Sequence, residues 1–274
     1  MKKIFNQKSM IRFCLAFIGA LFLIALCAPL LAQFAFDEQF IERAFALPSS
    51  THWFGNDALG RDLFSRIVYA TRISMSIALL TAFSSITLGI VYGSIAGYAG
   101  GWVDRVMMRI VDILYTLPSL IVVILVMLVF GRDLKGLFIA LTAVGWLGTA
   151  RIMRVQVLSW KKRSFVEAAT ALGQKRLKIL LRHILPNCMA PIFVELSYQI
   201  PTNVLAEAFL SFLGIGVAPP TPSWGVLADD GWKALYTHPH LIVFPGLLIF
   251  FTMMSFNLVG DYLRDRFDPH LANS

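Results

Sequence analysis

The chain has 274 residues, of which 57% are hydrophobic and only 15% are charged, and its mean hydropathy is +0.70. A typical soluble domain carries about a quarter charged residues, so this composition excludes an ordinary soluble protein. Apolar runs of about 20 residues match the thickness of a bilayer, which predicts an all-α membrane protein. The net charge of +8 favours contact with anionic lipid headgroups over nucleic acid. The three cysteines are too few for a disulfide framework.

Hydropathy and helix-end signals predict six transmembrane helices in chain order. The first follows a basic N-terminal flank, and its length favours a retained span over a cleaved signal peptide. We expect the spans at about 13–32, 73–97, 113–130, 137–157, 189–212 and 241–262.

The orientation of these spans follows from the loops that carry most of the 24 Lys and Arg residues. The richest basic segment is the loop of about 158–188, which places that loop and both termini in the cytoplasm. Arg61, Arg66 and Arg72 lie on the outer side, accompanied by Asp57 and Asp62. We divide the chain into 1–72, which holds the first span and an external loop, and 73–270, which holds five spans.

The second predicted span carries Gly89, Gly93 and Gly97 at four-residue spacing. Small residues on one helical face allow two helices to approach closely in lipid, so we expect a packing seam there.

Polar side chains recur at helical spacing along the predicted fifth span, which is otherwise apolar. Because carboxylates and amides are costly in a bilayer, the stripe must face protein or a wet cavity. It could line a translocation pathway or form hydrogen bonds between helices, and Pro201 predicts a kink within it. The members of the stripe are Glu195, Gln199, Thr202, Asn203 and Glu207.

The basic loop at about 158–188 contains two predicted helical segments. The first runs from Phe165 to a stop at Gly173, and its small residues would let another protein approach the backbone. The second, from Lys175 to Ile184, is basic and amphipathic and could lie on the inner leaflet, with Pro186 ending it.

Four motifs carry a resemblance to a known family. Glu167-Ala168-Ala169 with Gly173 resembles the EAA loop of membrane subunits of binding-protein-dependent ABC importers. The segment 52–66 resembles a signature of the peptide/nickel branch, with Asn56 in place of the usual Thr. It reads His52-Trp53-Phe54-Gly55-Asn56-Asp57-Ala58-Leu59-Gly60-Arg61-Asp62-Leu63-Phe64-Ser65-Arg66. The stretches 207–225 and 260–269 are similar to the end of the fifth span and to the C-terminal tail of that branch. The chain therefore resembles the C-type permease subunit of dipeptide/oligopeptide ABC importers.

The resemblance implies a type I importer permease in the inner membrane of a bacterium, and not an enzyme. Its partners would be a second permease subunit, two cytoplasmic ATP-binding subunits and an external solute-binding protein. ATP and Mg would be bound by the partners, and this chain would hold no cofactor and no metal; the sequence contains no P-loop. The residues that dock the ATP-binding subunit would be Glu167, Ala168, Ala169, Leu172 and Gly173, and the candidate pathway residues are Glu195, Gln199, Asn203 and Glu207.

Within the branch, short peptides are the expected substrate, with nickel chelates, glutathione-like compounds and haem as alternatives. A secondary transporter that works without ATP would show inverted repeats, and none stands out. An intramembrane enzyme would need a nucleophile or metal constellation; His238 and His240 have no third ligand beside them in the sequence.

Overall fold

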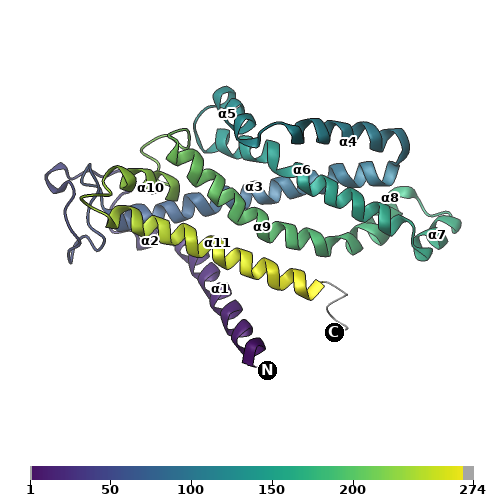
Figure 1. Cartoon of the computed structure of the whole chain (residues 1–274), viewed down its shortest axis with the longest axis horizontal. Coiled ribbons are helices and arrows are strands. Elements are labelled where there is room, and N and C mark those ends of the chain that lie inside the picture. Colours follow the sequence, from purple (N-terminus) through teal and green to yellow (C-terminus); the bar gives the residue numbers. More distant parts are fainter. Residues whose placement is uncertain (1, 268–274) are drawn as a thin grey trace. The chain divides into compact units, whose positions relative to one another are not determined.

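The computed structural model describes the backbone of residues 2–267 and the side chains of residues 8–267. Within this part the chain is helical, and β-pairing is limited to an isolated bridge between Asn56 and Asp62 (Figure 1). Residues 268–270 of the predicted permease core, with Asp268 and Pro269 of the tail motif, lie outside the described residues. The α-helices are α1 (Lys2–Leu26), α2 (Ala28–Leu31), α3 (Leu63–Ala99), α4 (Gly101–Thr116), α5 (Ser119–Phe130), α6 (Leu134–Lys161), α7 (Ser164–Ala171), α8 (Arg176–Ile179), α9 (Leu185–Phe212), α10 (Trp224–Lys233) and α11 (His240–Phe267), with a 3-10 turn at Ile41–Arg43 and a π-helical turn at Leu180–Ile184.

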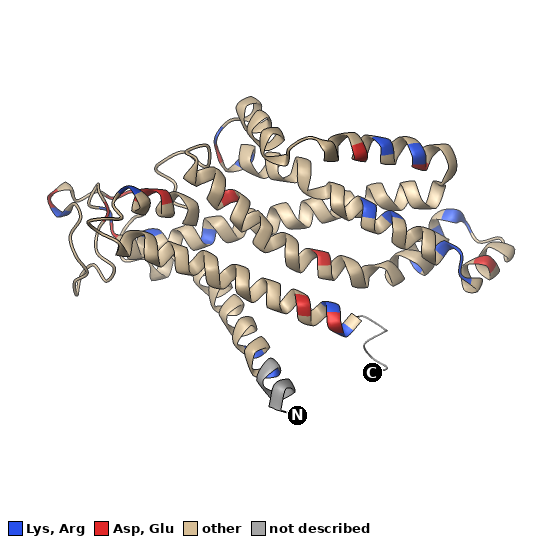
Figure 2. Ribbon diagram, in the orientation of Figure 1, with Lys and Arg blue, Asp and Glu red and all other residues tan. Residues whose placement is uncertain are grey.

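Five helices in the described part are long and apolar enough to cross a membrane, or up to six spans if the bent pair α4–α5 counts as one. Figure 2 shows that charged residues are sparse along most of these helices and gather near helix ends and in loops. The all-α membrane class is therefore confirmed. Helix α3 has 37 residues and begins ten residues before the predicted second span, and α1 begins eleven residues before the predicted first span and ends six residues before the end of that span.

The predicted continuous third span at 113–130 is wrong, because the chain breaks inside it. Helix α4 ends at Thr116, Leu117 is extended with a ψ of 136°, and α5 begins at Ser119 after a bend of 92°. Pro118 explains the break, since its ring disfavours helical geometry in the preceding residue and it has no N–H for the helical ladder.

A second correction concerns Pro186, which does not end the basic segment. The chain passes from α8 through the π-helical turn directly into α9, and Pro186 is the second residue of that helix. Proline is tolerated in the first turn of a helix because the N–H groups there have no partner within the helix. Helix α9 also runs through Pro201 without interruption, and the kink expected there stays a prediction.

The contacts of the chain group into two compact units, each assembled from separate stretches. The first comprises the described residues up to Leu80, with Met127–Phe138 and Ile200–Val259; the second comprises Thr81–Val126, Ile139–Gln199 and the described residues from Gly260 onward. The division at residue 72 made from the sequence stays a prediction.

In the second unit, α3 packs against α6 along the predicted glycine seam. A Cβ atom added to Gly89 would lie 2.5 Å from Cβ of Thr149, and one added to Gly97 would lie 2.8 Å from the carbonyl oxygen of Arg154. At Gly93 it would collide with the carbonyl oxygen of Ala150. The close approach expected from the glycine spacing is confirmed.

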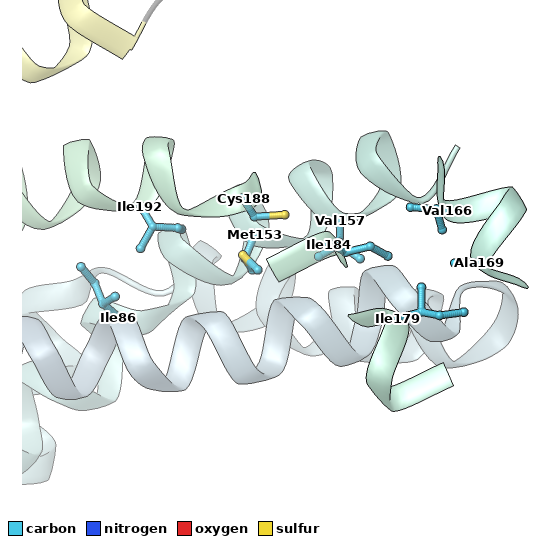
Figure 3. Packing of buried hydrophobic residues seen from close by; sticks show 9 residues of the cluster. All are labelled: Ile86, Met153, Val157, Val166, Ala169, Ile179, Ile184, Cys188 and Ile192. Carbon is cyan, nitrogen blue, oxygen red and sulfur yellow. The ribbon is translucent and has the colours of Figure 1, made fainter. Parts of the chain in front are cut away.

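The same unit holds an apolar cluster that joins α3, α6 and the segments between α6 and α9 to the first turns of α9. Figure 3 shows its side chains together with the short helix α7. Its members are Ile86, Met153, Val157, Val166, Ala169, Ile179, Ile184, Cys188 and Ile192.

Candidate functional site

The segment before α3 forms a buried cluster of charged side chains around Asp57. Its Oδ2 atom accepts a hydrogen bond of 2.7 Å from Nε of Arg61 and also pairs with Nη1 of Arg66. Asp230 of α10 lies 3.1 Å from Arg66 and 3.5 Å from Arg61. Both arginines and Asp57 are buried. Arg61 and Arg66, two of the three arginines predicted on the outer side, are therefore paired with acidic groups within the protein, whereas Arg72 is exposed.

Asp62 pairs with His52 and not with an arginine. Nδ1 of His52 lies 2.9 Å from Oδ1 of Asp62, and the N–H of Ser65 donates to Oδ2 at 2.8 Å. The side chain of Asn56 donates to the carbonyl oxygen of Gly60 at 2.7 Å. Gly60 has a φ of +73°, and a Cβ there would collide with the backbone of Phe40. The signature 52–66 thus determines the shape of the loop through buried contacts.

Glu207, at the far end of the polar stripe, is fully enclosed in a hydrogen-bond network. Its two carboxylate oxygens accept from the hydroxyl groups of Ser74 at 3.0 Å and Ser211 at 2.9 Å. The hydroxyl group of Ser74 in turn accepts from the N–H of Trp224 at 3.1 Å. This one carboxylate therefore joins α9 to α3 and, through Ser74, to the start of α10.

The remaining members of the stripe differ in their surroundings. Gln199 donates to the carbonyl oxygen of Gly145 at 2.9 Å, and Asn203 donates to that of Ala78 at 3.1 Å. Both side chains are buried. Glu195 is half-buried and makes no hydrogen bond or ion pair with another described residue. Gln199, Asn203 and Glu207 thus each form a hydrogen bond to another helix, whereas the carboxylate of Glu195 has no partner among the described residues.

Helix α7 carries the EAA sequence and ends as expected. Leu172 follows its last residue, and Gly173 has a φ of +72°. The N–H of Gln174 bonds the carbonyl oxygen of Ala169 at 3.2 Å, and the N–H of Gly173 bonds that of Thr170 at 3.0 Å. This pair of bonds is a Schellman motif, which requires a left-handed residue at the position of Gly173. The predicted glycine stop is confirmed.

The two sides of α7 have different surroundings. Val166 and Ala169 are buried in the apolar cluster, as Figure 3 shows. Glu167 and Ala168 are exposed, and Leu172 is 80% exposed. The structure therefore places Ala169, one of the expected docking residues, on the inner side of α7, and the other four on its outer surface or at its end.

A surface cavity of about 640 Å³ lies beside α7. Its lining includes Glu167 and Gln174 from the loop, and Tyr98 from the end of α3. Nζ of Lys161, which also lines it, donates to the carbonyl oxygen of Tyr98 at 2.6 Å and so ties the end of α6 to the end of α3. Of the expected docking residues, Glu167 is the one that lines this cavity.

A family model described as "binding-protein-dependent transport system inner membrane component" matches residues 89–273. The chain belongs to this family. Its members are membrane subunits of transport systems and not enzymes, and the matched region contains α7 and the whole polar stripe.

Several curated relatives of this family member are permease proteins of peptide transport systems. It is 44% identical to the oligopeptide permease protein OppC of Bacillus subtilis over 94% of this chain and 84% of the relative. It is 42% identical to the dipeptide permease protein DppC of the same organism over 92% of this chain and 79% of the relative. The glutathione permease protein GsiD of Pectobacterium atrosepticum is 39% identical, over 82% of this chain and 75% of the relative.

A solved structure supports the fold of the family. A chain of the MetNI methionine ABC transporter, in inward-facing conformations, superposes with a TM-score of 0.61 at 16% identity. The match covers 74% of this chain and 96% of that chain. The type I importer architecture expected from the motifs is therefore confirmed at the level of fold.

Sequence reasoning missed two sets of charged partners. Asp230 completes the Asp57 cluster from more than 160 positions away, and no motif or spacing connected it to the arginines. Arg154, inside the predicted fourth span, is held by Asp104 of α4 through bonds of 2.5 and 2.6 Å. Because a charged residue within a membrane span needs a partner, the position of Arg154 in the predicted fourth span could have indicated that it pairs with an acidic residue.

Proposed function

We propose that this chain is one of the two membrane subunits of an ATP-driven importer of di- and oligopeptides. The observation that carries the proposal is the identity of 44% and 42% to oligopeptide and dipeptide permease proteins over more than nine-tenths of the chain. The family's description as an inner membrane component of binding-protein-dependent systems supports a partner protein that delivers substrate from outside.

The proposed partners are a second permease subunit, two cytoplasmic ATP-binding subunits and an external solute-binding protein. ATP and Mg would be bound by the ATP-binding subunits. Within the described residues, no group of three or more His, Cys, Asp or Glu side chains could hold a metal ion.

The exposed side of α7, with the cavity beside it, is the proposed docking site for an ATP-binding subunit. Leu172 would be its central apolar contact, because it is the most exposed large apolar residue of α7 and its cap. Glu167 and Ala168 flank it on the same exposed side. Gly173 would hold the chain in the turn that presents Leu172.

Packing suggests how a displacement of α7 would reach the membrane helices. Val166 and Ala169 share one cluster with Met153 of α6 and with Cys188 of α9. Close-packed apolar side chains transmit displacement because they leave little free volume. A force applied to α7 by a partner would therefore be passed to α6 and to the first turns of α9.

Orientation follows from this docking proposal. If α7 meets cytoplasmic ATP-binding subunits, the loop between α6 and α9 lies in the cytoplasm, and so do both termini. The concentration of Lys and Arg in that loop supports the same orientation.

We propose that the members of the polar stripe contribute unequally to the translocation pathway. Glu195 is the member best placed to meet a polar substrate, because its carboxylate is half-buried and unpaired among the described residues. Gln199, Asn203 and Glu207 would first have to give up their hydrogen bonds.

Glutathione is a second candidate substrate, because four glutathione permease relatives are 37–39% identical over 82–97% of this chain. Glutathione is itself a short peptide, so the architecture and the coupling would be unchanged.

The substrate is tested by uptake in cells that lack this chain and in cells complemented with it. The panel would hold labelled dipeptides, labelled oligopeptides, glutathione and nickel. Loss of di- or oligopeptide uptake, restored by the complementing chain, is the expected result. Loss of glutathione or nickel uptake alone would refute di- and oligopeptides as the substrates, but the chain would still be assigned as an importer subunit.

Docking is tested separately by purification of the assembled transporter through a tag on this chain. Leu172→Glu should lose the ATP-binding subunits while the chain still inserts and retains the second permease. Leu47→Glu is the matched control, since Leu47 is 69% exposed in the loop before α3. Full recovery of the ATP-binding subunits with Leu172→Glu would refute the docking site.

A further inference from the structure

A second cavity, unrelated to α7, is lined mainly by arginines. It has a volume of about 500 Å³, within the range of roughly 300–1,000 Å³ that ligand pockets span. Helix α4 contributes Arg105 and Arg109, and α6 contributes Arg151 and Arg154. Asp112 is the acidic residue of the lining.

The two arginines from α6 already have partners. Arg154 makes two bonds with Asp104, and Arg151 pairs with Asp112 at 2.7 Å. The guanidinium group of Arg151 also lies 4.1 Å from the ring centroid of Tyr115. Two acidic groups thus balance two of the four cations, and they hold those two side chains in place.

Arg105 and Arg109 are left without compensation. Both are exposed, and neither forms an ion pair or a hydrogen bond with any other described residue. Four positions apart, they lie on one face of α4, where two like charges repel each other. An anion bound between them would remove that repulsion. The four arginines of the cavity therefore carry an excess of two positive charges over their acidic partners.

The cavity lies near the ends of membrane-spanning helices, where a membrane surface is expected. Arg105 is the fifth residue of α4, and Arg154 is seven residues, or about 10 Å, from the end of α6. The bond between Lys161 and Tyr98 shows that α6 and α3 end together, where α4 begins. Trp102, 70% exposed in the first turn of α4, is the type of residue that sits at headgroup level.

Exposed apolar side chains lie next to the arginines. Val155 of α6 lines the cavity, and Val106 and Ile110 directly follow the two arginines along α4; the acyl chains of a lipid could contact such exposed apolar side chains. Basic pockets between transmembrane helices at this level bind the head groups of anionic lipids. We infer that the cavity between α4 and α6 is a binding site for the phosphate group of an anionic phospholipid, with Arg105 and Arg109 as its principal ligands.

The inference does not depend on the transported substrate, and lipid binding tests it directly. The assembled transporter, purified in detergent, would be titrated with phosphatidylglycerol or phosphatidylcholine, and bound lipids would be counted by native mass spectrometry. The double variant Arg105→Gln/Arg109→Gln should weaken binding of the tightest phosphatidylglycerol by about thirtyfold, because each of the two interfacial cations contributes about 1 kcal/mol and about 1.4 kcal/mol corresponds to a factor of ten. Binding of phosphatidylcholine should not change.

Lys8→Gln/Arg12→Gln on α1 is the matched control, because it removes two exposed cations that do not line the cavity. It should leave the tightest phosphatidylglycerol in place, and Arg105→Lys/Arg109→Lys should keep most of the binding. Inorganic phosphate should compete poorly, since it lacks the acyl chains.

Three outcomes would overturn the inference. Equal losses in the glutamine variant and in the α1 control would show that only net charge attracts lipid. Displacement of the lipid by millimolar inorganic phosphate would identify a free-anion site. Loss of the second permease subunit from the Arg105→Gln/Arg109→Gln complex, with lipid binding unchanged, would identify the surface as a protein interface.

Discussion

The hydroxyl group of Ser74 on α3 donates a hydrogen bond of 3.0 Å to the carboxylate of Glu207 on α9. Glu207 is 1% exposed, and its other oxygen accepts from Ser211. A buried donor left without its acceptor costs about 1–3 kcal/mol. This residue, expected in a pathway, therefore has a structural role in the arrangement observed.

The first prediction follows from that bond. Glu207→Ala should lower the thermal midpoint and the yield of the purified transporter, because two buried hydroxyl groups lose their acceptor, at a cost of about 1–3 kcal/mol. Glu207→Gln keeps one carbonyl acceptor and should lose less. The midpoint is measured by the loss of monodisperse complex on heating. A Glu207→Ala variant that is as stable as wild type but inactive in uptake would contradict the structural role and indicate that Glu207 acts directly in transport.

The second prediction concerns the end of α7. A Cβ at Gly173 would meet nothing within 4 Å, so any penalty there arises from its φ of +72° and not from crowding. Gly173→Val should strain this turn by about 1–2 kcal/mol and reduce uptake, while insertion stays normal. Gly173→Asn is the control of choice, because asparagine adopts left-handed geometry at low cost. Uptake at wild-type level in the Val variant would count against the coupling role.

The third prediction tests the seam between α3 and α6. Gly93→Ala should destabilise the protein, since its methyl group collides with a backbone carbonyl that cannot move independently of α6. Gly246→Ala, on α11, is a matched control, because nothing lies within 4 Å of its Cβ position. Thermal midpoints of both variants provide the comparison, and equal midpoints would contradict the packing described.

The fourth prediction concerns the Asp57 cluster. Asp57→Asn should reduce folded protein strongly, because it leaves two buried guanidinium groups with Asp230 as their sole carboxylate neighbour in the cluster; breaking a buried pair costs about 3–5 kcal/mol. Asp37→Asn, an exposed position in the same region, should have little effect. Membrane-inserted protein on immunoblots is the readout. Normal amounts of the Asp57→Asn protein would show that Asp230 alone compensates both arginines.

Much of the site was predictable because it depends on local sequence. The stop at Gly173 is set by the conformational freedom of one residue, and the glycine seam is set by spacing along one helix. The break before Pro118 was also encoded locally, by a proline within an apolar run. It was missed because mean hydropathy does not register a single missing N–H group.

The chain's order of apolar and polar residues alone determined that it is a helical membrane protein, where most of its spans lie, and where α7 ends. Only the tertiary structure decided which side chains are buried and which groups each polar side chain contacts. Ala169 is buried in the apolar cluster, Asn203 and Glu207 form hydrogen bonds with a neighbouring helix, and Arg66 forms an ion pair with Asp230. The physical reason is that periodicity states which residues share a face of a helix, whereas the partner facing them is set by contacts between distant segments.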